Sequence, residues 1–194
     1  MLQPALQTLD MKKLVLGGII GSDALSFAEG IIKGNPHLEK IAWYNNRIES
    51  VDDMQRLCNS IKNKASTSLN AIDLDNAFDG NNSEMMQIVL DASLALERLE
   101  LSDNGIGSVG APLIANFLAS NPPLKEMDIE DNDLSDDDAT LMANALQSNV
   151  NLEELYLDDN TDITTVGRQA LLESIFNVSS LNACATSTTN AVYM

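Results

Sequence analysis

The sequence predicts an α/β solenoid, in which a parallel β-sheet lines the concave side and α-helices cover the convex side. The first observation is a phrase of apolar residues and one asparagine that recurs with starts at Leu96, Leu124 and Leu152, 28 residues apart. The second is that each phrase alternates apolar and polar residues, which is typical of a strand with one buried face. The third is that apolar residues at helical spacing follow each phrase. Such units bury their apolar faces only against each other, and this favours a stacked array.

The whole chain, residues 1–194, is expected to form one domain of such repeats. Repeats start near residues 11, 38, 69, 96, 124 and 152, and a partial repeat at 181 precedes a polar tail over 185–194. The intervals between these starts are 27, 31, 27, 28, 28 and 29 residues. A chain that is 44% hydrophobic can fill a substantial core, and because only 4% is aromatic, that core must be aliphatic.

The first three repeats follow the phrase with departures. Ile19 and Ala77 stand where the first and third repeats would have the asparagine. Trp43 occupies a leucine position in the second repeat, which predicts that its indole lies in the core. The longer second repeat places a bulge around residues 62–68. Serines suited to capping stand at three expected helix starts: Ser22, Ser50 and Ser83.

In the three clear repeats, strand, turn and helix follow one another in the same order. The asparagine, such as Asn104, turns the chain out of the strand, and its amide can satisfy backbone groups that would otherwise be buried and unpaired. The apolar helical stripes are Leu113, Ile114, Phe117 and Leu118, then Leu141, Met142, Ala145 and Leu146, then Ala170, Leu171, Ile175 and Phe176. Ser135 precedes three aspartates, which suit a helix N-terminus. Asn35, Asn121 and Asn149 follow helices, where a left-handed residue is often needed.

The two ends of the array carry no convincing cap in the sequence. Residues 1–10 are short for a capping helix, and the segment after Cys184 is polar with no helical pattern. Three interpretations stay open. The tail covers the last strand, or the chain is a piece of a longer array, or the ends meet another chain. Self-association through open ends belongs to the third, so the oligomeric state is left undecided.

The phrase at Leu96, Leu99, Leu101 and Asn104 fits the pattern L-x-x-L-x-L-x-x-N, and with its period it resembles a leucine-rich repeat. The long unit with a helix in each repeat resembles the ribonuclease-inhibitor-like class of that family. The resemblance covers roughly residues 11–184. It implies a horseshoe-shaped, non-enzymatic interaction protein of a mostly intracellular, eukaryotic class. Such a protein binds protein partners through its concave face or a rim and carries no cofactor.

The chain is strongly acidic, with 29 Asp and Glu against 11 Lys and Arg and a formal net charge of −18. This charge repels nucleic-acid phosphates and anionic lipid, so we expect neither nucleic acid nor membrane as a partner. A basic protein is the favoured partner. No apolar run is long enough to span a membrane, and the N-terminus lacks the pattern of a secretory signal. Cys58 and Cys184 fit buried thiols of a reducing compartment, so the predicted location is cytoplasmic.

In this architecture the third, fifth, seventh and eighth residues of each repeat face outward on the concave side. The first two repeats place no acid there, whereas the next four place eleven acids among sixteen positions. We therefore expect a gradient from a neutral or mildly basic end to a strongly acidic one, which attracts a basic partner. The predicted partner-binding residues are Asp73, Asp75, Glu100, Asp103, Glu126, Asp128, Glu130, Asp131, Glu154, Asp158 and Asp159, with Tyr44 and Tyr156 as aromatic anchors.

Two rows of these side chains are expected. Asp73, Glu100 and Asp128 share one row that leads to Tyr156, and Asp103, Asp131 and Asp159 share another. Adjacent strands lie about 4.8 Å apart, so like charges in a row oppose each other. The alternative interpretation is that the acids serve solubility alone.

No catalytic or metal site is predicted. Residues 131–138 are rich in carboxylates, but an EF-hand loop would need glycine and glutamate where Asp136 and Met142 stand. A solvated helix N-terminus explains the run better, with weak adventitious cation binding as the alternative. His37 is the sole histidine and lies beside Pro36 at an expected turn, so no Cys/His pair suggests itself.

From these observations we expect a non-enzymatic protein–protein interaction scaffold that binds a basic partner through an acidic concave face. Two alternatives stay open. One is a regulator of a small GTPase that uses a rim of the array. The other is a fragment of a longer receptor-like array with no activity of its own.

Overall fold

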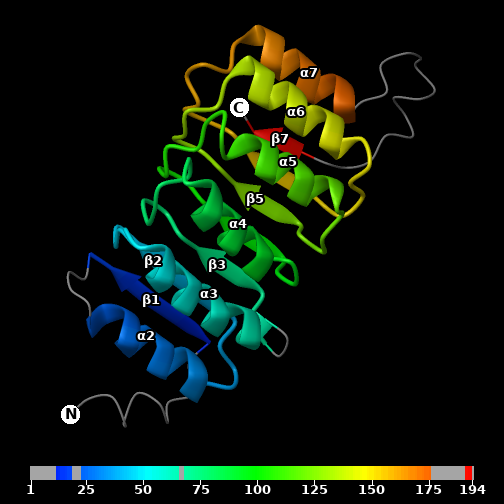
Figure 1. The fold of residues 1–194 in the computed structure, drawn as a ribbon. Coiled ribbons are helices and arrows are strands. Elements are labelled where there is room, and N and C mark those ends of the chain that lie inside the picture. The colour runs from blue at the N-terminus through cyan, green and yellow to red at the C-terminus, as the bar shows by residue number, and fades with distance from the viewer. Residues whose placement is uncertain (1–11, 19–22, 66–67, 176–190, 194) are drawn as a thin grey trace.

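The computed structural model describes residues 12–18, 23–65, 68–175 and 191–193. A seven-stranded parallel sheet runs through them with its strands in chain order, and the helices lie together on one face of it (Figure 1). The strands are β1 (Lys13–Gly17), β2 (Lys40–Tyr44), β3 (Ala71–Asp73), β4 (Arg98–Glu100), β5 (Glu126–Asp128), β6 (Glu154–Tyr156) and β7 (Ala191–Tyr193). The helices are α2 (Asp23–Gly34), α3 (Val51–Ala65), α4 (Ser83–Ala92), α5 (Ala111–Ala119), α6 (Asp136–Leu146) and α7 (Thr165–Ile175).

The predicted α/β solenoid is confirmed by this order of elements. Each of the first six strands begins two residues after an expected repeat start, at residues 13, 40, 71, 98, 126 and 154. The central residue of each short strand is buried and its neighbours are partly or fully exposed in β4, β5 and β6. The parallel register places Leu99 beside Met127 and Met127 beside Leu155, so the apolar phrases stack into one continuous ladder.

Residues 191–193, within the predicted polar tail over 185–194, form β7. Val192 lies beside Leu155 of β6, whereas Leu181 and Cys184, the expected seventh repeat, lie outside the described residues. The segment Ala191–Tyr193 contains a β-branched and an aromatic residue, and both favour strands. Residues 191–193 therefore pair with the last strand of the clear repeats, β6.

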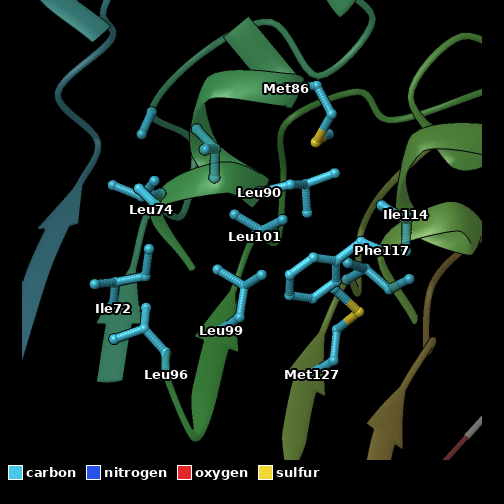
Figure 2. Packing of buried hydrophobic residues seen from close by; sticks show 14 of the residues in the cluster. Ile72, Leu74, Met86, Leu90, Leu96, Leu99, Leu101, Ile114, Phe117 and Met127 are labelled. Atoms are coloured by element: carbon cyan, nitrogen blue, oxygen red, sulfur yellow. The ribbon is translucent and has the colours of Figure 1, made fainter. Parts of the chain in front are cut away.

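The core between sheet and helices is aliphatic, as predicted from composition. Leu96, Leu99 and Leu101 of the fourth repeat are fully buried, and so are Leu74 and Met127 of the repeats beside it. Figure 2 shows side chains of the strands and of helices α4 and α5 reaching into the same layer. Each helix also contacts the helix of the next repeat, so neighbouring units share their buried surface.

Buried asparagines tie the second, fourth, fifth and sixth repeats each to the repeat before it. The Asn104 amide Nδ2 donates to the carbonyl of Leu74 in the preceding repeat at 2.8 Å and to that of Leu101 at 2.9 Å. Its Oδ1 accepts from the backbone N of Ala77 at 2.9 Å and of Phe78 at 3.0 Å. Asn104 thus satisfies the loop of the third repeat, in which Ala77 replaces the asparagine. Equivalent bonds to the preceding repeat are made by Asn46, Asn132 and Asn160.

Trp43 lies in the core, as its leucine position predicted. Its exposed fraction is 4%, and its indole Nε1 donates to the carbonyl of Asn46 at 2.7 Å. The indole therefore fills core volume while its single polar group stays paired.

Two of the predicted helix-capping serines, Ser135 and Ser50, cap their helices in the structure. Ser135 forms a capping box with Asp138, and Ser50 accepts from the backbone N of Asp53 at 3.1 Å. The expected cap Ser83 is instead the first helical residue of α4. Asn82 caps that helix, because its side-chain oxygen accepts from the backbone N of residues 84 and 85. Ser22 lies outside the described residues.

The three asparagines expected to be left-handed divide into two kinds. Asn121 has φ of 56° and fits the expectation. Asn35 and Asn149 are not left-handed and are buried instead. Asn35 Nδ2 donates to the carbonyl of Ile31 at 2.7 Å, and Asn149 Nδ2 donates to that of Leu118 at 2.8 Å. These two asparagines close the helix ends through side-chain bonds.

Candidate functional site

The central row of the concave face runs across all seven strands. The register aligns Val15, Ala42, Asp73, Glu100, Asp128, Tyr156 and Tyr193 in that order. The expected row of three acids leading to Tyr156 is therefore present. The row begins with small apolar side chains, carries three carboxylates in its middle and ends in two tyrosines.

A second row lies two residues earlier in each strand. It runs through Lys13, Lys40, Ala71, Arg98, Glu126, Glu154 and Ala191. Its cations belong to β1, β2 and β4, and its acids to β5 and β6. The predicted gradient from a basic to an acidic end is thus present in this row as well.

Where each strand turns outward, a third group of acids follows. Asp103, Asp131 and Asp159 have φ of 53°, 50° and 59°, and all three side chains are exposed. Asn45 and Asn76 take the same left-handed conformation in the second and third repeats. Asp and Asn tolerate this conformation better than most residues, so either can occupy the turn. The charge at this position can therefore differ from one repeat to the next.

The backbone around the half-buried acids is held by their own side chains. Asp128 Oδ1 accepts from the hydroxyl of Ser102 at 2.8 Å and from the backbone N of Glu130 at 3.0 Å. Asp73 Oδ1 accepts from the backbone N of Asp75 at 3.3 Å. These bonds fix the turn after the strand and hold the carboxylates in their rows.

One lysine neutralises part of the central row. Lys40 Nζ lies 2.6 Å from Glu100 Oε1 and 3.8 Å from Asp73 Oδ2. It reaches β4 from β2 because Ala71, between them in its row, has only a methyl side chain. Burial raises the pKa of Glu100, and Asp73 adds to this, while the hydrogen bond from Lys40 acts in the opposite direction. The sequence did not predict this bridge.

Further along the face, the acids act on one another. Burial raises the pKa of Asp75, and the charges of Asp73 and Asp103 raise it further. Burial likewise raises the pKa of Glu130, helped by Asp128 and Asp158. The site therefore holds more negative charge than its own cations offset, and its field favours a cation from outside.

An aromatic pair closes the acidic end. The rings of Tyr156 and Tyr193 are stacked, with centroids 4.5 Å apart and planes inclined by 8°. The Tyr156 hydroxyl donates to Glu154 Oε2 at 2.5 Å, and this bond raises the pKa of the phenol. Tyr193 was missed because it falls in the segment expected to be a polar tail. The apolar and aromatic residues at positions 191–193 could have indicated a strand there.

Tyr44, the other predicted anchor, lies far from this pair, on β2. Its exposed fraction is 37%, and its ring lies over Gly17 of β1, where an added Cβ would meet the ring carbons. One face of the Tyr44 ring is thus covered within the protein. The structure does not bring Tyr44 together with Tyr156.

Two of the five aspartates in residues 131–138, Asp136 and Asp138, act as helix caps. The Asp138 carboxylate accepts from the Ser135 hydroxyl at 2.7 Å, and Asp136 accepts from the Thr164 hydroxyl at 2.7 Å and from the backbone N of Gly167 at 2.8 Å. The Thr164 hydroxyl bond lowers the pKa of Asp136, which caps the start of α7 from the preceding repeat. Across the described ranges, no three His, Cys, Asp or Glu side chains gather in a way that could hold a metal ion.

The described surface has hollows at two places that bear on the site. One, of about 410 Å³, lies between α2 and α3 and is lined by Glu29, Ile32, Lys33, Ser60, Asn63 and Lys64. The other, of about 150 Å³, lies at the start of β4, β5 and β6 and is lined by Glu97, Arg98, Lys125, Glu126, Glu153 and Glu154. The second adjoins the aromatic pair through Glu154. Within the part of the chain that the structure describes, no helix is long and apolar enough to cross a bilayer.

Comparison with known proteins finds a family model that matches three segments of the chain. A family model described as "Leucine Rich repeat" matches residues 94–115, 120–143 and 148–172. No curated protein matches the chain. Among solved structures, the tropomodulin C-terminal domain of Caenorhabditis elegans is 14% identical, with 89% of this chain and 87% of that chain covered and a TM-score of 0.42. A likeness at this level carries no argument about function.

Proposed function

We propose that this chain, three of whose repeats match the leucine-rich repeat model, is a non-enzymatic interaction scaffold whose acidic concave face binds a basic segment of a partner protein. Repeats of this family generally mediate protein–protein interaction. We place the repeats in the long, ribonuclease-inhibitor-like class, since 27 to 31 residues and a helix make up each unit. The proposed location is the cytoplasm, which suits the free, buried Cys58 thiol, whose pKa burial raises to about 12.

One observation carries the proposal: the alignment of carboxylates from four successive repeats on one face. The central row alone brings Asp73, Glu100 and Asp128 onto neighbouring strands, and only Lys40 pairs with them among the ion pairs of the described residues. Placing like charges side by side opposes folding, whereas the same field speeds the encounter with a cationic partner. A basic segment would supply the missing counter-charge.

A set of substitutions that the turns tolerate tests this proposal. The concave variant is Asp103→Asn, Asp131→Asn and Asp159→Asn, and it copies the asparagines that the second and third repeats already use in this conformation. The matched control removes three exposed charges from convex helices, through Asp52→Asn, Asp91→Asn and Glu173→Gln. The probe is a blocked decalysine peptide, and its affinity is measured by calorimetry at low and at physiological salt.

The proposal expects the concave variant to bind the peptide several-fold more weakly than the control variant, with a shallower salt dependence. If both variants bind the peptide equally weakly, net charge alone attracts the peptide. That result would contradict binding at the concave face. The two other functions expected from the sequence, small-GTPase regulation and membership of a longer receptor-like array, draw on none of the contacts described above.

A further inference from the structure

We propose that the stacked tyrosines Tyr156 and Tyr193, with the neighbouring carboxylates Glu154 and Glu126, form a site selective for an arginine side chain of the partner. The inference rests on the proposed function, because it names the residue type that the acidic face selects. It adds a chemical preference that charge alone does not give, since a row of carboxylates attracts lysine and arginine alike.

The aromatic pair supplies a stacking surface. The two rings lie almost parallel, 4.5 Å apart between centroids, and 43% of Tyr193 is exposed. The face of a tyrosine ring carries negative potential, and it attracts a cation placed over it. Tyr156 donates its hydroxyl hydrogen to Glu154 Oε2 at 2.5 Å. Donation to a carboxylate adds electron density to the ring, so this bond strengthens its attraction for a cation.

The carboxylates beside the rings supply the second contact. Glu154 comes two residues before Tyr156 on β6, so both side chains face the concave side. Glu126 precedes Glu154 in the same row, and both line the hollow of about 150 Å³ at the strand starts. In that row Arg98 of β4 lies beside Glu126 of β5. Glu154 of β6 lies one strand further from Arg98. Lys125 lines the same hollow and pairs with Glu97 at 3.8 Å, and none of the ion pairs of the described residues includes Glu154, so Glu154 can receive an outside cation.

Arginine fits this arrangement better than lysine. Its guanidinium is planar and stacks on an aromatic ring, and its edge can at the same time donate two hydrogen bonds to a carboxylate. The ammonium of lysine is compact and strongly hydrated, and it cannot make both contacts in one plane.

The same chemistry is not available at Tyr44. The ring of Tyr44 covers Gly17, and the residues around it on β2 include Lys40 and Ala42 but no acid. Tyr44 is thus an internal control, an exposed aromatic side chain on the same concave face without carboxylate neighbours on its strand.

The test compares blocked decaarginine and decalysine peptides of equal charge, with affinities measured by calorimetry at low salt. The variants are Tyr193→Leu, which keeps apolar bulk but removes the ring, Tyr193→Phe, which keeps the ring, and the control Tyr44→Leu. Wild-type protein, Tyr193→Phe and Tyr44→Leu are expected to prefer the arginine peptide. Tyr193→Leu is expected to lose about three- to fivefold of that preference, because it weakens binding of the arginine peptide more than binding of the lysine peptide.

The outcomes separate this inference from the proposed function. If neither peptide binds the wild-type protein, the proposed function itself falls. If both bind and the preference for arginine is the same in Tyr193→Leu as in wild type, the acidic face stands and the arginine site is wrong. Should Tyr193→Leu weaken both peptides equally, the ring acts only by holding β7 in place. That result also overturns the arginine site.

Discussion

Lys40 of β2 and Glu100 of β4 meet across an intervening strand, with 2.6 Å between Nζ and Oε1. The contact exists because Ala71 of β3 leaves space above it for the lysine chain. Both side chains are about three-quarters buried, at 22% and 25% exposure. The bridge joins the basic end of the concave face to its acidic end, and it marks where one gives way to the other.

Lys40→Met should lower the free energy of unfolding by about 1–2 kcal/mol at neutral pH, because it leaves the half-buried Glu100 without its counter-ion. Loss of the lysine raises the pKa of Glu100 further, so the penalty should shrink as Glu100 becomes protonated at lower pH. Urea denaturation at pH 7 and pH 5 measures both effects. The control is Lys125→Met, whose pair with Glu97 at 3.8 Å is half exposed and should matter by less than about 0.5 kcal/mol.

Asn104→Ala should destabilise the protein by about 2–4 kcal/mol, because it leaves the buried backbone groups of two repeats unpaired. These include the Leu74 carbonyl and the backbone N of Ala77 and Phe78. Equilibrium denaturation measures the loss. A cost below about 1 kcal/mol would show that water replaces the amide at little expense.

Asp136→Ala should lower the melting temperature, because it removes the acceptor that caps α7 from the preceding repeat. The Asp136 carboxylate has a pKa below its ordinary value, so the stability it contributes is present above that value and is lost as pH falls through the folded pKa. The difference from wild type should therefore disappear in acid. Asp137→Ala is the control: it removes the same charge from the first turn of α6 but no side-chain hydrogen bond to α7, so it should lower the melting temperature less than Asp136→Ala does.

The repeat could be predicted from sequence because it is local. Leu96, Leu99 and Leu101 belong to one short phrase, and their spacing alone sets which face is buried. The acidic rows were equally predictable, since a parallel register with a constant period brings corresponding positions such as Glu100 and Asp128 side by side.

Two features of the site escaped the sequence for physical reasons. The bridge from Lys40 to Glu100 depends on the reach of a flexible chain over a small neighbour, and no periodic pattern encodes that. Strand β7 lacks the leucine phrase, so Tyr193 had no repeat position to mark it as a neighbour of Tyr156. In both cases the contact joins residues whose pairing is set by tertiary structure.

Mild acidification should stabilise the protein before stronger acid unfolds it. The folded pKa values of Asp75, Glu100 and Glu130 lie above their ordinary values, so the folded state binds these protons more tightly than the unfolded chain. Their contribution is favourable at low pH and is lost as pH rises through the folded pKa. The melting temperature should therefore rise as the pH is lowered from 7 to about 5. The variant Asp75→Asn with Glu130→Gln should melt higher than wild type at pH 7 and show a smaller rise.

The most direct test of the acidic concave face is a nuclear magnetic resonance titration of the isotope-labelled protein with decalysine peptide. Perturbed backbone amides are expected to cluster at the turns that carry Asp103, Asp131 and Asp159 and at the neighbouring strands, and to fade as salt is added. Perturbations spread evenly over the convex helices, or confined to the hollow between α2 and α3, would contradict the account.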